Sequence, residues 1–220
     1  MASNESVNIQ GYYTVGEEIV NSITHGIGTV LSIAGLTILV VFAALHGDAW
    51  HIVSFSIFGS TLIVLYAAST LYHGISNPLA KRFLNKLDHS AIFLLIAGTY
   101  TPFMLVNLRG GWGWSIFGII WALAIIGITI KLISVHRFRR LSVAVYVFMG
   151  WLGLIAIKEI VRTVPSSSVI LIVVGGVAYT AGVLFYLCRR LPFNHGIWHI
   201  FVLCGSVSHF FSVLGILDPK

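Results

Sequence analysis

The chain has 220 residues, of which 57% are hydrophobic and 9% are charged, and its formal net charge at pH 7 is +6. A soluble domain carries about 25% charged residues, so this composition excludes water as the main solvent and leaves little chain for a separate soluble domain. The basic residues form short clusters between apolar runs, as in loops that face anionic lipid, so we do not expect nucleic acid as a partner. The expected partner is the lipid bilayer.

Seven apolar runs follow one another along the chain, each near the roughly 20 residues that span a bilayer as a helix. Glycine- or proline-containing segments separate the runs, so the connections are short and neighbouring helices are expected to pack antiparallel. The sequence predicts an all-α membrane protein, a bundle of seven transmembrane helices over residues 19–217 preceded by an N-terminal segment over 1–18. The expected helices are 19–45, 52–75, 87–107, 114–134, 141–161, 168–188 and 195–217.

The distribution of lysine and arginine predicts how the bundle is oriented. Nine basic residues fall on one side of the expected bundle and four on the other, and cytoplasmic loops carry the excess. The N-terminal segment over 1–18 is therefore predicted to be cytoplasmic and the C-terminus to lie outside, in a multi-pass protein of the cell membrane. The nine are Lys81, Arg82, Lys86, Lys131, Arg137, Arg139, Arg140, Arg189 and Arg190, and the four are Arg109, Lys158, Arg162 and Lys220.

Three histidines carry the clearest chemical signal. His195 and His199 stand four residues apart on the last expected helix, so their rings project from one face and can bind a single metal ion. The second expected helix runs from outside to inside, which brings His73 level with the start of the last helix. Three neutral imidazoles suit zinc and leave one coordination position open, as in catalytic zinc sites, although copper or nickel can compete in vitro. The pattern predicts a zinc site.

Two further polar residues are expected in the same layer. Asp88 is expected to open the third helix on that side, where its carboxylate can hold or deprotonate a water molecule at the metal. Ser69 lies one turn deeper than His73 on the same helical face, where its hydroxyl can orient a ligand or polarise a substrate carbonyl. The alternative is that interfacial histidines bond headgroups or neighbouring helices without a metal. Buried ionisable groups in membranes are costly and usually functional, which favours the site.

These residues resemble the motif of the progestin and adiponectin receptor family: Ser69-x3-His73, then Leu87-Asp88, then His195-x3-His199. The chain is more similar still to the bacterial hemolysin III branch, through Asn-Ser-Ile-Thr-His-Gly at 21–26 and Gly-Thr-Tyr-Thr-Pro-Phe at 98–103. The resemblance implies a seven-helix bundle with zinc on the three histidines and Asp88 near a metal-bound water. It also implies kinship with a superfamily that includes alkaline ceramidases, which are membrane amide hydrolases.

Four other polar residues are weighed against this site. His25 shares a polar stripe with neighbouring side chains of the first helix and is either a second-layer partner of the site or an interhelical contact; both interpretations stay open. His89 points about 100° away from Asp88 and is left outside the site. His209 lies about 15 Å along the helix from His199, which predicts an interhelical hydrogen bond instead. Ser206 shares the face of His195 and is expected to line a cavity.

Three functions are compatible with the sequence. The first is a zinc-dependent hydrolase that cleaves an amide or ester bond of a lipid-like substrate. The second is a pore or haemolysin, which needs a polar lining through the full depth of the membrane, whereas the polar residues here gather at one face. The third is a metal-stabilised receptor or regulator of membrane state in which zinc ties helices together without chemistry. Substrate and oligomeric state are left open.

Overall fold

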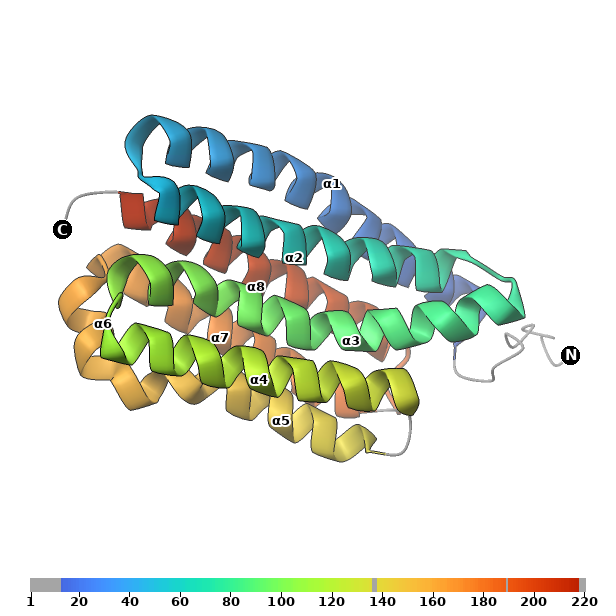
Figure 1. Cartoon of the computed structure of the whole chain (residues 1–220). Coiled ribbons are helices and arrows are strands. Elements are labelled where there is room, and N and C mark those ends of the chain that lie inside the picture. The colour runs from blue at the N-terminus through green and yellow to red at the C-terminus, as the bar shows by residue number, and fades with distance from the viewer. Residues whose placement is uncertain (1–12, 136–137, 189, 218–220) are drawn as a thin grey trace, which may run out of the picture.

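The computed structural model describes residues 13–135, 138–188 and 190–217, and these form a bundle of helices joined by short connections (Figure 1). The α-helices are α1 Val15–His46, α2 Ala49–Gly74, α3 Pro78–Pro102, α4 Gly111–Ile133, α5 Arg139–Trp151, α6 Ile157–Thr163, α7 Ser166–Leu187 and α8 Asn194–Leu214. A π-helix, Phe103–Asn107, continues α3, and 3-10 helices, Leu152–Ala156 and Gly215–Leu217, join α5 to α6 and end α8.

Within the described residues, seven helical stretches are long and apolar enough to cross a membrane. The segments α5 and α6 together with the 3-10 turn between them make one span, Arg140–Thr163, and each other span is one helix with any short continuation. Helix α1 begins at one end of the bundle and α8 ends at the opposite one, as an odd number of spans requires (Figure 1). The predicted seven-helix membrane protein is confirmed, and the side of the membrane that each terminus faces stays a prediction.

The first helix begins earlier than the sequence predicts, at Val15 instead of residue 19. A reciprocal hydrogen-bond pair starts it: Thr14 Oγ1 accepts from the Glu17 backbone N–H at 3.2 Å, and Glu17 Oε2 accepts from the Thr14 N–H at 2.8 Å. The last residues of the expected N-terminal segment therefore belong to the first turn of α1, where Glu18 is buried. Residues 1–12 of that segment lie outside the described residues.

The third helix also begins early, at Pro78 rather than residue 87, so the expectation that Asp88 opens this helix is wrong. Asn77 Oδ1 accepts hydrogen bonds from the backbone N–H groups of Leu79 and Ala80 at 3.0 and 3.1 Å, and proline is favoured in the first turn. The polar stretch after Pro78 looks like a loop in the sequence but folds as helix, because Lys81 is buried against Glu18. Asp88 consequently lies well inside α3.

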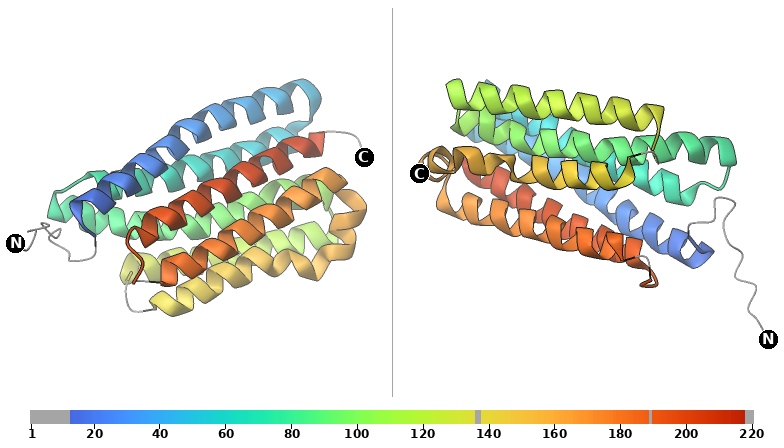
Figure 2. Two further views of the ribbon diagram at one scale, coloured as in Figure 1. Left: turned by 180° about the vertical axis from the view of Figure 1, so that it is seen from behind. Right: turned by 90° about the horizontal axis from the view of Figure 1, so that it is seen from below.

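Packing between the helices is uneven. Helices α1 and α2, α2 and α3, and α7 and α8 pack along much of their lengths, whereas α5 contacts α3, α4 and α7 sparsely (Figure 2). The largest fully buried side chains include Phe55, Phe58 and Tyr66, all on α2. Helix α2 is therefore the centre of the apolar core, and the histidine at its end is held by a rigid element.

Helices α2 and α3 approach closely at Gly98, because a Cβ atom there would overlap the buried side chain of Thr61. The Thr61 hydroxyl is held by a 2.7 Å hydrogen bond to the Phe58 carbonyl, so it cannot turn away freely. We expect Gly98→Ala to lower the stability of the purified protein by about 1 to 3 kcal/mol, as overpacking does. The measurement is thermal unfolding in detergent.

The control for that prediction is Gly118→Ala, the same change at an exposed position of α4 where an added Cβ meets nothing within 4 Å. Alanine has the higher helix propensity, so this variant should be as stable as the parent or slightly more stable. Equal unfolding temperatures for Gly98→Ala and the parent would contradict the close approach of α2 and α3.

Candidate metal centre

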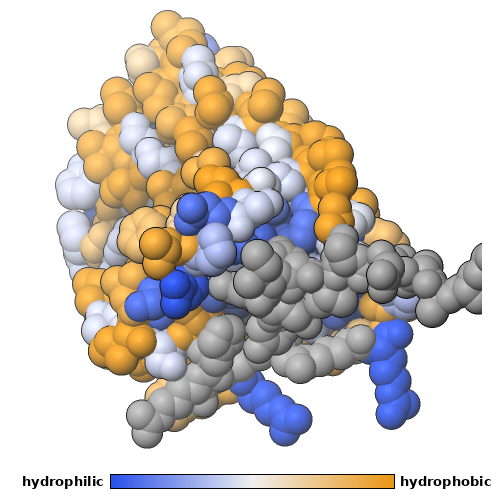
Figure 3. Space-filling view, turned by 90° about the vertical axis from the view of Figure 1, so that its right-hand side faces the viewer, coloured by the Kyte–Doolittle hydropathy of each residue, from blue (hydrophilic) through white to orange (hydrophobic). Residues whose placement is uncertain are grey.

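The three histidines singled out by the sequence converge in the structure. His73 lies at the end of α2, and His195 and His199 occupy the first turns of α8, at the end of the bundle where α1 begins. All three side chains are buried, and one ligand nitrogen from each lies within 4.8 Å of the other two. Hydrophilic residues gather at this end, and hydrophobic residues cover the sides (Figure 3). We refer to these three residues as the histidine cluster.

The histidine cluster fits a metal ion by its chemistry as well as its spacing. The Nε2 atom of His73 is buried and has no hydrogen-bond partner among the described residues, whereas its Nδ1 atom is engaged by a carboxylate. A buried nitrogen left without a partner is costly in an apolar environment, and coordination to an ion would remove that cost. Three imidazole nitrogens are a donor set that zinc favours.

Glu18 completes this arrangement, and the sequence analysis did not identify it. The His73 Nδ1–H donates to Glu18 Oε2 at 2.6 Å, and Lys81 Nζ lies 2.9 Å from Glu18 Oε1. Lys81 also donates to the Tyr72 carbonyl at 2.9 Å. A signal for Glu18 was present: the capping pattern of Thr14 and Glu17 starts the helix early enough to place Glu18 in its first turn.

Helix α1 also contacts His199. The Nδ1 atom of His199 lies 3.2 Å from the Asn21 backbone oxygen and 3.2 Å from Thr24 Oγ1. His25 stacks flat on the His199 ring, with centroids 3.4 Å apart and an angle of 13° between the planes. Both ring nitrogens of His25 are buried and lack hydrogen-bond partners among the described residues. The structure therefore shows His25 in a ring contact that joins α1 to α8 beside the histidine cluster, which fits both interpretations.

Asp88 and Ser69 occupy different surroundings. Asp88 lines the same cavity as His195 and His199, and its carboxylate lies 3.5 Å from His89 Nδ1. Asp88 does not belong to the group of three residues whose ligand atoms lie within 4.8 Å of one another. Ser69 is buried one turn before His73, and its hydroxyl has no hydrogen-bond partner among the described residues. Ser69 is not among the residues that line the cavity. The structure thus places Asp88 in the lining of the cavity that His195 and His199 also line.

Two expectations about the deeper part of α8 have different outcomes. The interhelical hydrogen bond predicted for His209 is confirmed, because its Nε2 lies 3.2 Å from the Ile172 carbonyl of α7. The expectation that Ser206 lines the cavity is wrong. Its hydroxyl instead lies 2.8 Å from both the Tyr66 and the Tyr179 hydroxyl groups.

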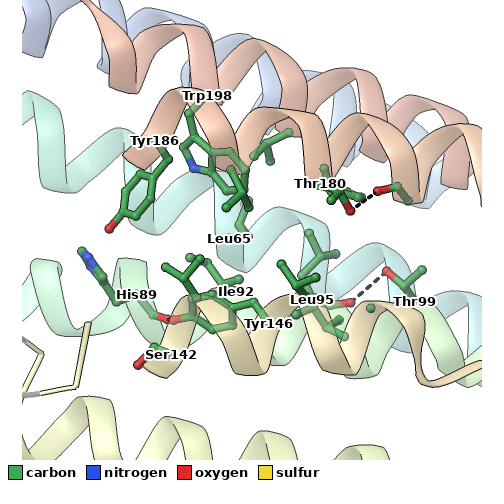
Figure 4. Close-up of a pocket in the computed structure, with 18 of the residues that line it drawn as sticks. Leu65, His89, Ile92, Leu95, Thr99, Ser142, Tyr146, Thr180, Tyr186 and Trp198 are labelled. Carbon is green, nitrogen blue, oxygen red and sulfur yellow. Dashed lines mark hydrogen bonds between the residues drawn. The ribbon is translucent and has the colours of Figure 1, made fainter. Parts of the chain in front are cut away.

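A cavity of about 150 Å³ lies inside the bundle, and most of its lining residues belong to α3, α5, α7 and α8. His195 and His199 of the histidine cluster line it, whereas His73 does not. Asp88, His195 and His199 line one part of it, and most of the remaining wall is apolar. Figure 4 shows Ile92, Leu95 and Tyr146 facing this space from α3 and α5, with Tyr186 and Trp198 opposite. The cavity therefore joins a polar, histidine-rich end to an apolar interior.

A seven-helix bundle with a buried histidine cluster at one end defines a class of multi-pass membrane proteins, and comparison of sequences identifies the family. The sequence model of the family described as "Haemolysin-III related" matches residues 13–210, so the chain belongs to that family. The chain is similar to "Hemolysin-3" of Bacillus cereus, with 50% identity over 93% of this chain and 94% of that protein.

Two other relatives define the range of the similarity. The "Hemolysin-3 homolog" of Bacillus subtilis (strain 168) is 49% identical over 92% of this chain and 95% of that protein. The human "Monocyte to macrophage differentiation factor" is 25% identical over 91% of this chain and 84% of that protein, which fits placement beside the progestin and adiponectin receptors. No solved structure matches the chain.

Proposed function

We propose that the chain is a zinc-binding membrane hydrolase that cleaves an amide or ester bond of a lipid-like substrate. The observation that carries this proposal is a cluster of three buried imidazoles, of which those of His195 and His199 line a mostly apolar cavity that Asp88 also lines. An apolar wall accommodates a hydrocarbon chain, and the polar end presents the groups that hydrolysis requires. The orientation predicted from the sequence would give this end access to the cytoplasmic leaflet.

In this proposal His73, His195 and His199 would hold the zinc ion, which would supply Lewis-acid polarisation at the reacting carbonyl or water. Asp88 acts as the general base, because it lines the same cavity as His195 and His199. A carboxylate oxygen of Asp88 takes a proton from the water that attacks the carbonyl carbon. The same proton then passes to the nitrogen or oxygen that leaves, so that a carboxylic acid and an amine or alcohol are formed. Ser69 does not line the cavity, so its proposed role is limited to orienting a group bound at the ion, through the buried hydroxyl one turn before His73.

The second candidate is a metal-stabilised receptor or regulator without catalysis, and one observation favours it. Polar contacts around the histidine cluster join four helices: Glu18 of α1 bonds His73 of α2 and pairs with Lys81 of α3, and Asn21 of α1 contacts His199 of α8. An ion held by the histidine cluster would tie α2 to α8, and the polar contacts would extend this link to α1 and α3. The pore is less favoured, because aromatic and aliphatic side chains fill the interior around α2.

Zinc content is the first test of either function. Protein purified without an affinity metal is expected to contain about one equivalent of zinc per chain, because three imidazoles converge on one position. Elemental analysis of the protein in detergent measures this content. A value well below one equivalent, not restored by incubation with zinc followed by gel filtration, would argue against the metal centre.

Lipid turnover separates the two candidates. The zinc-loaded protein is incubated with a membrane lipid extract, with and without a chelator, and products are measured by mass spectrometry. Appearance of free fatty acids with the matching amine or alcohol, and their loss with the chelator, supports the hydrolase. A chelator that lowers the unfolding temperature, without any turnover by the loaded protein, supports the structural role.

A further inference from the structure

Helix α1 supplies none of the three residues of the histidine cluster, yet it contacts two of them. Glu18 Oε2 lies 2.6 Å from the Nδ1 atom of His73, and the Asn21 backbone oxygen lies 3.2 Å from the Nδ1 atom of His199. Both contacts are buried, and Glu18 and Asn21 stand three residues apart on the same face of α1. The buried face of α1 therefore contacts the histidine cluster through the Nδ1 atoms of His73 and His199.

Each contact decides which nitrogen of its histidine carries the proton. A carboxylate and a backbone carbonyl can only accept hydrogen bonds, so a neutral ring beside them keeps its proton on Nδ1. The lone pair then stands on Nε2. At His73 that atom is the buried nitrogen without a hydrogen-bond partner among the described residues. A metal-binding histidine is commonly held in this way, with the outer nitrogen bonded to a carboxylate or carbonyl.

Lys81 makes the buried carboxylate tolerable at this position. Its Nζ lies 2.9 Å from Glu18 Oε1, the oxygen that His73 does not use, and the side chains of Glu18 and Lys81 are 10% and 3% exposed. An isolated buried charge is strongly destabilising, whereas a paired one with its remaining bonds satisfied is tolerated. The two oxygens of Glu18 thus serve two purposes: one is paired with a charge and the other orients a ring.

We propose that Glu18 is a positioning residue of the metal centre, which holds His73 in the tautomer and orientation that present Nε2 to the ion. The inference rests on the metal site of the proposed function but not on hydrolysis. A merely structural role for Glu18, as an anchor between α1 and α3 through Lys81, would leave the affinity for metal unchanged. The geometry favours positioning, because the contact engages Nδ1 of His73 and leaves its buried Nε2 without a hydrogen-bond partner among the described residues.

The experiment compares zinc affinity in four proteins in detergent: the parent, Glu18→Gln, the double variant Glu18→Leu with Lys81→Met, and Glu17→Gln. The double variant removes the acceptor without leaving a lone buried charge, and should bind zinc about 10- to 100-fold more weakly, the usual cost of losing such a partner. Glu18→Gln retains an amide oxygen that can accept from Nδ1, so it should recover most of the affinity. Glu17→Gln changes the same helical turn without contacting His73, and should bind like the parent.

Zinc affinity is measured by competition with a chromophoric chelator, and the absorption spectrum of the cobalt(II)-loaded proteins reports the geometry of the site. Unfolding temperatures of the metal-free proteins separate positioning from anchoring. Lower stability with unchanged zinc affinity and cobalt spectrum in the double variant would overturn the proposal. A parent protein that binds no zinc would refute the metal site itself, whereas zinc binding without turnover would refute the hydrolase and leave the role of Glu18 standing.

Discussion

His199→Ala is expected to weaken zinc binding by more than about 100-fold, the upper cost of losing a residue that only hydrogen-bonds a metal ligand. His73→Ala and His195→Ala should have the same effect. Each substitution removes one of three converging imidazoles, and two are too few to hold the ion against water. Elemental analysis after gel filtration, and competition with a chelator, measure the loss. This is the largest effect that we expect on metal content.

Two histidine variants serve as matched controls. His25 stacks on His199 but does not belong to the histidine cluster. His209 forms a hydrogen bond with the Ile172 carbonyl deep in the bundle. His25→Ala and His209→Ala should therefore keep about one zinc per chain. The loss of zinc in His209→Ala together with its retention in His199→Ala would contradict the placement of α8 in the bundle.

Asp88→Asn is expected to preserve zinc stoichiometry and to lower lipid turnover by about 10²- to 10⁴-fold, the usual scale for loss of a general base. Asparagine keeps the shape of the side chain and can still bond a water molecule, but it cannot accept a proton. Asp88 lines the cavity but is not one of the three residues expected to bind the ion, so the ion should remain in this variant. Turnover and zinc content are measured on the same preparation.

The control is Glu159→Gln, the same chemical change on α6, where the carboxylate pairs with Arg162 outside the cavity. Its turnover should equal that of the parent. Zinc loss in Asp88→Asn would show that Asp88 is a ligand or an indispensable anchor and would refute the role assigned to it. Full turnover with zinc retained would remove Asp88 from the mechanism.

The residues of the histidine cluster were predictable because local periodicity and topology suffice to place them. A spacing of four residues puts His195 and His199 on one helical face in any helix. Counting spans then brings the end of the second to the start of the seventh, which adds His73. The contacts of α1 were not predictable in this way, since they depend on the rotation of one helix about its axis against another.

The sequence by itself determined the class of protein, the number of spans and the three histidines, because the thickness of a bilayer and the period of a helix act on short stretches of chain. The tertiary structure decided how far the helices extend and what supports the histidine cluster. Lys81 looks like a loop residue beside Pro78, yet it is buried in helix because Glu18, 63 residues earlier, lies 2.9 Å away. Such a pairing depends on the packing of α1 against α2 and α3, which no local pattern encodes.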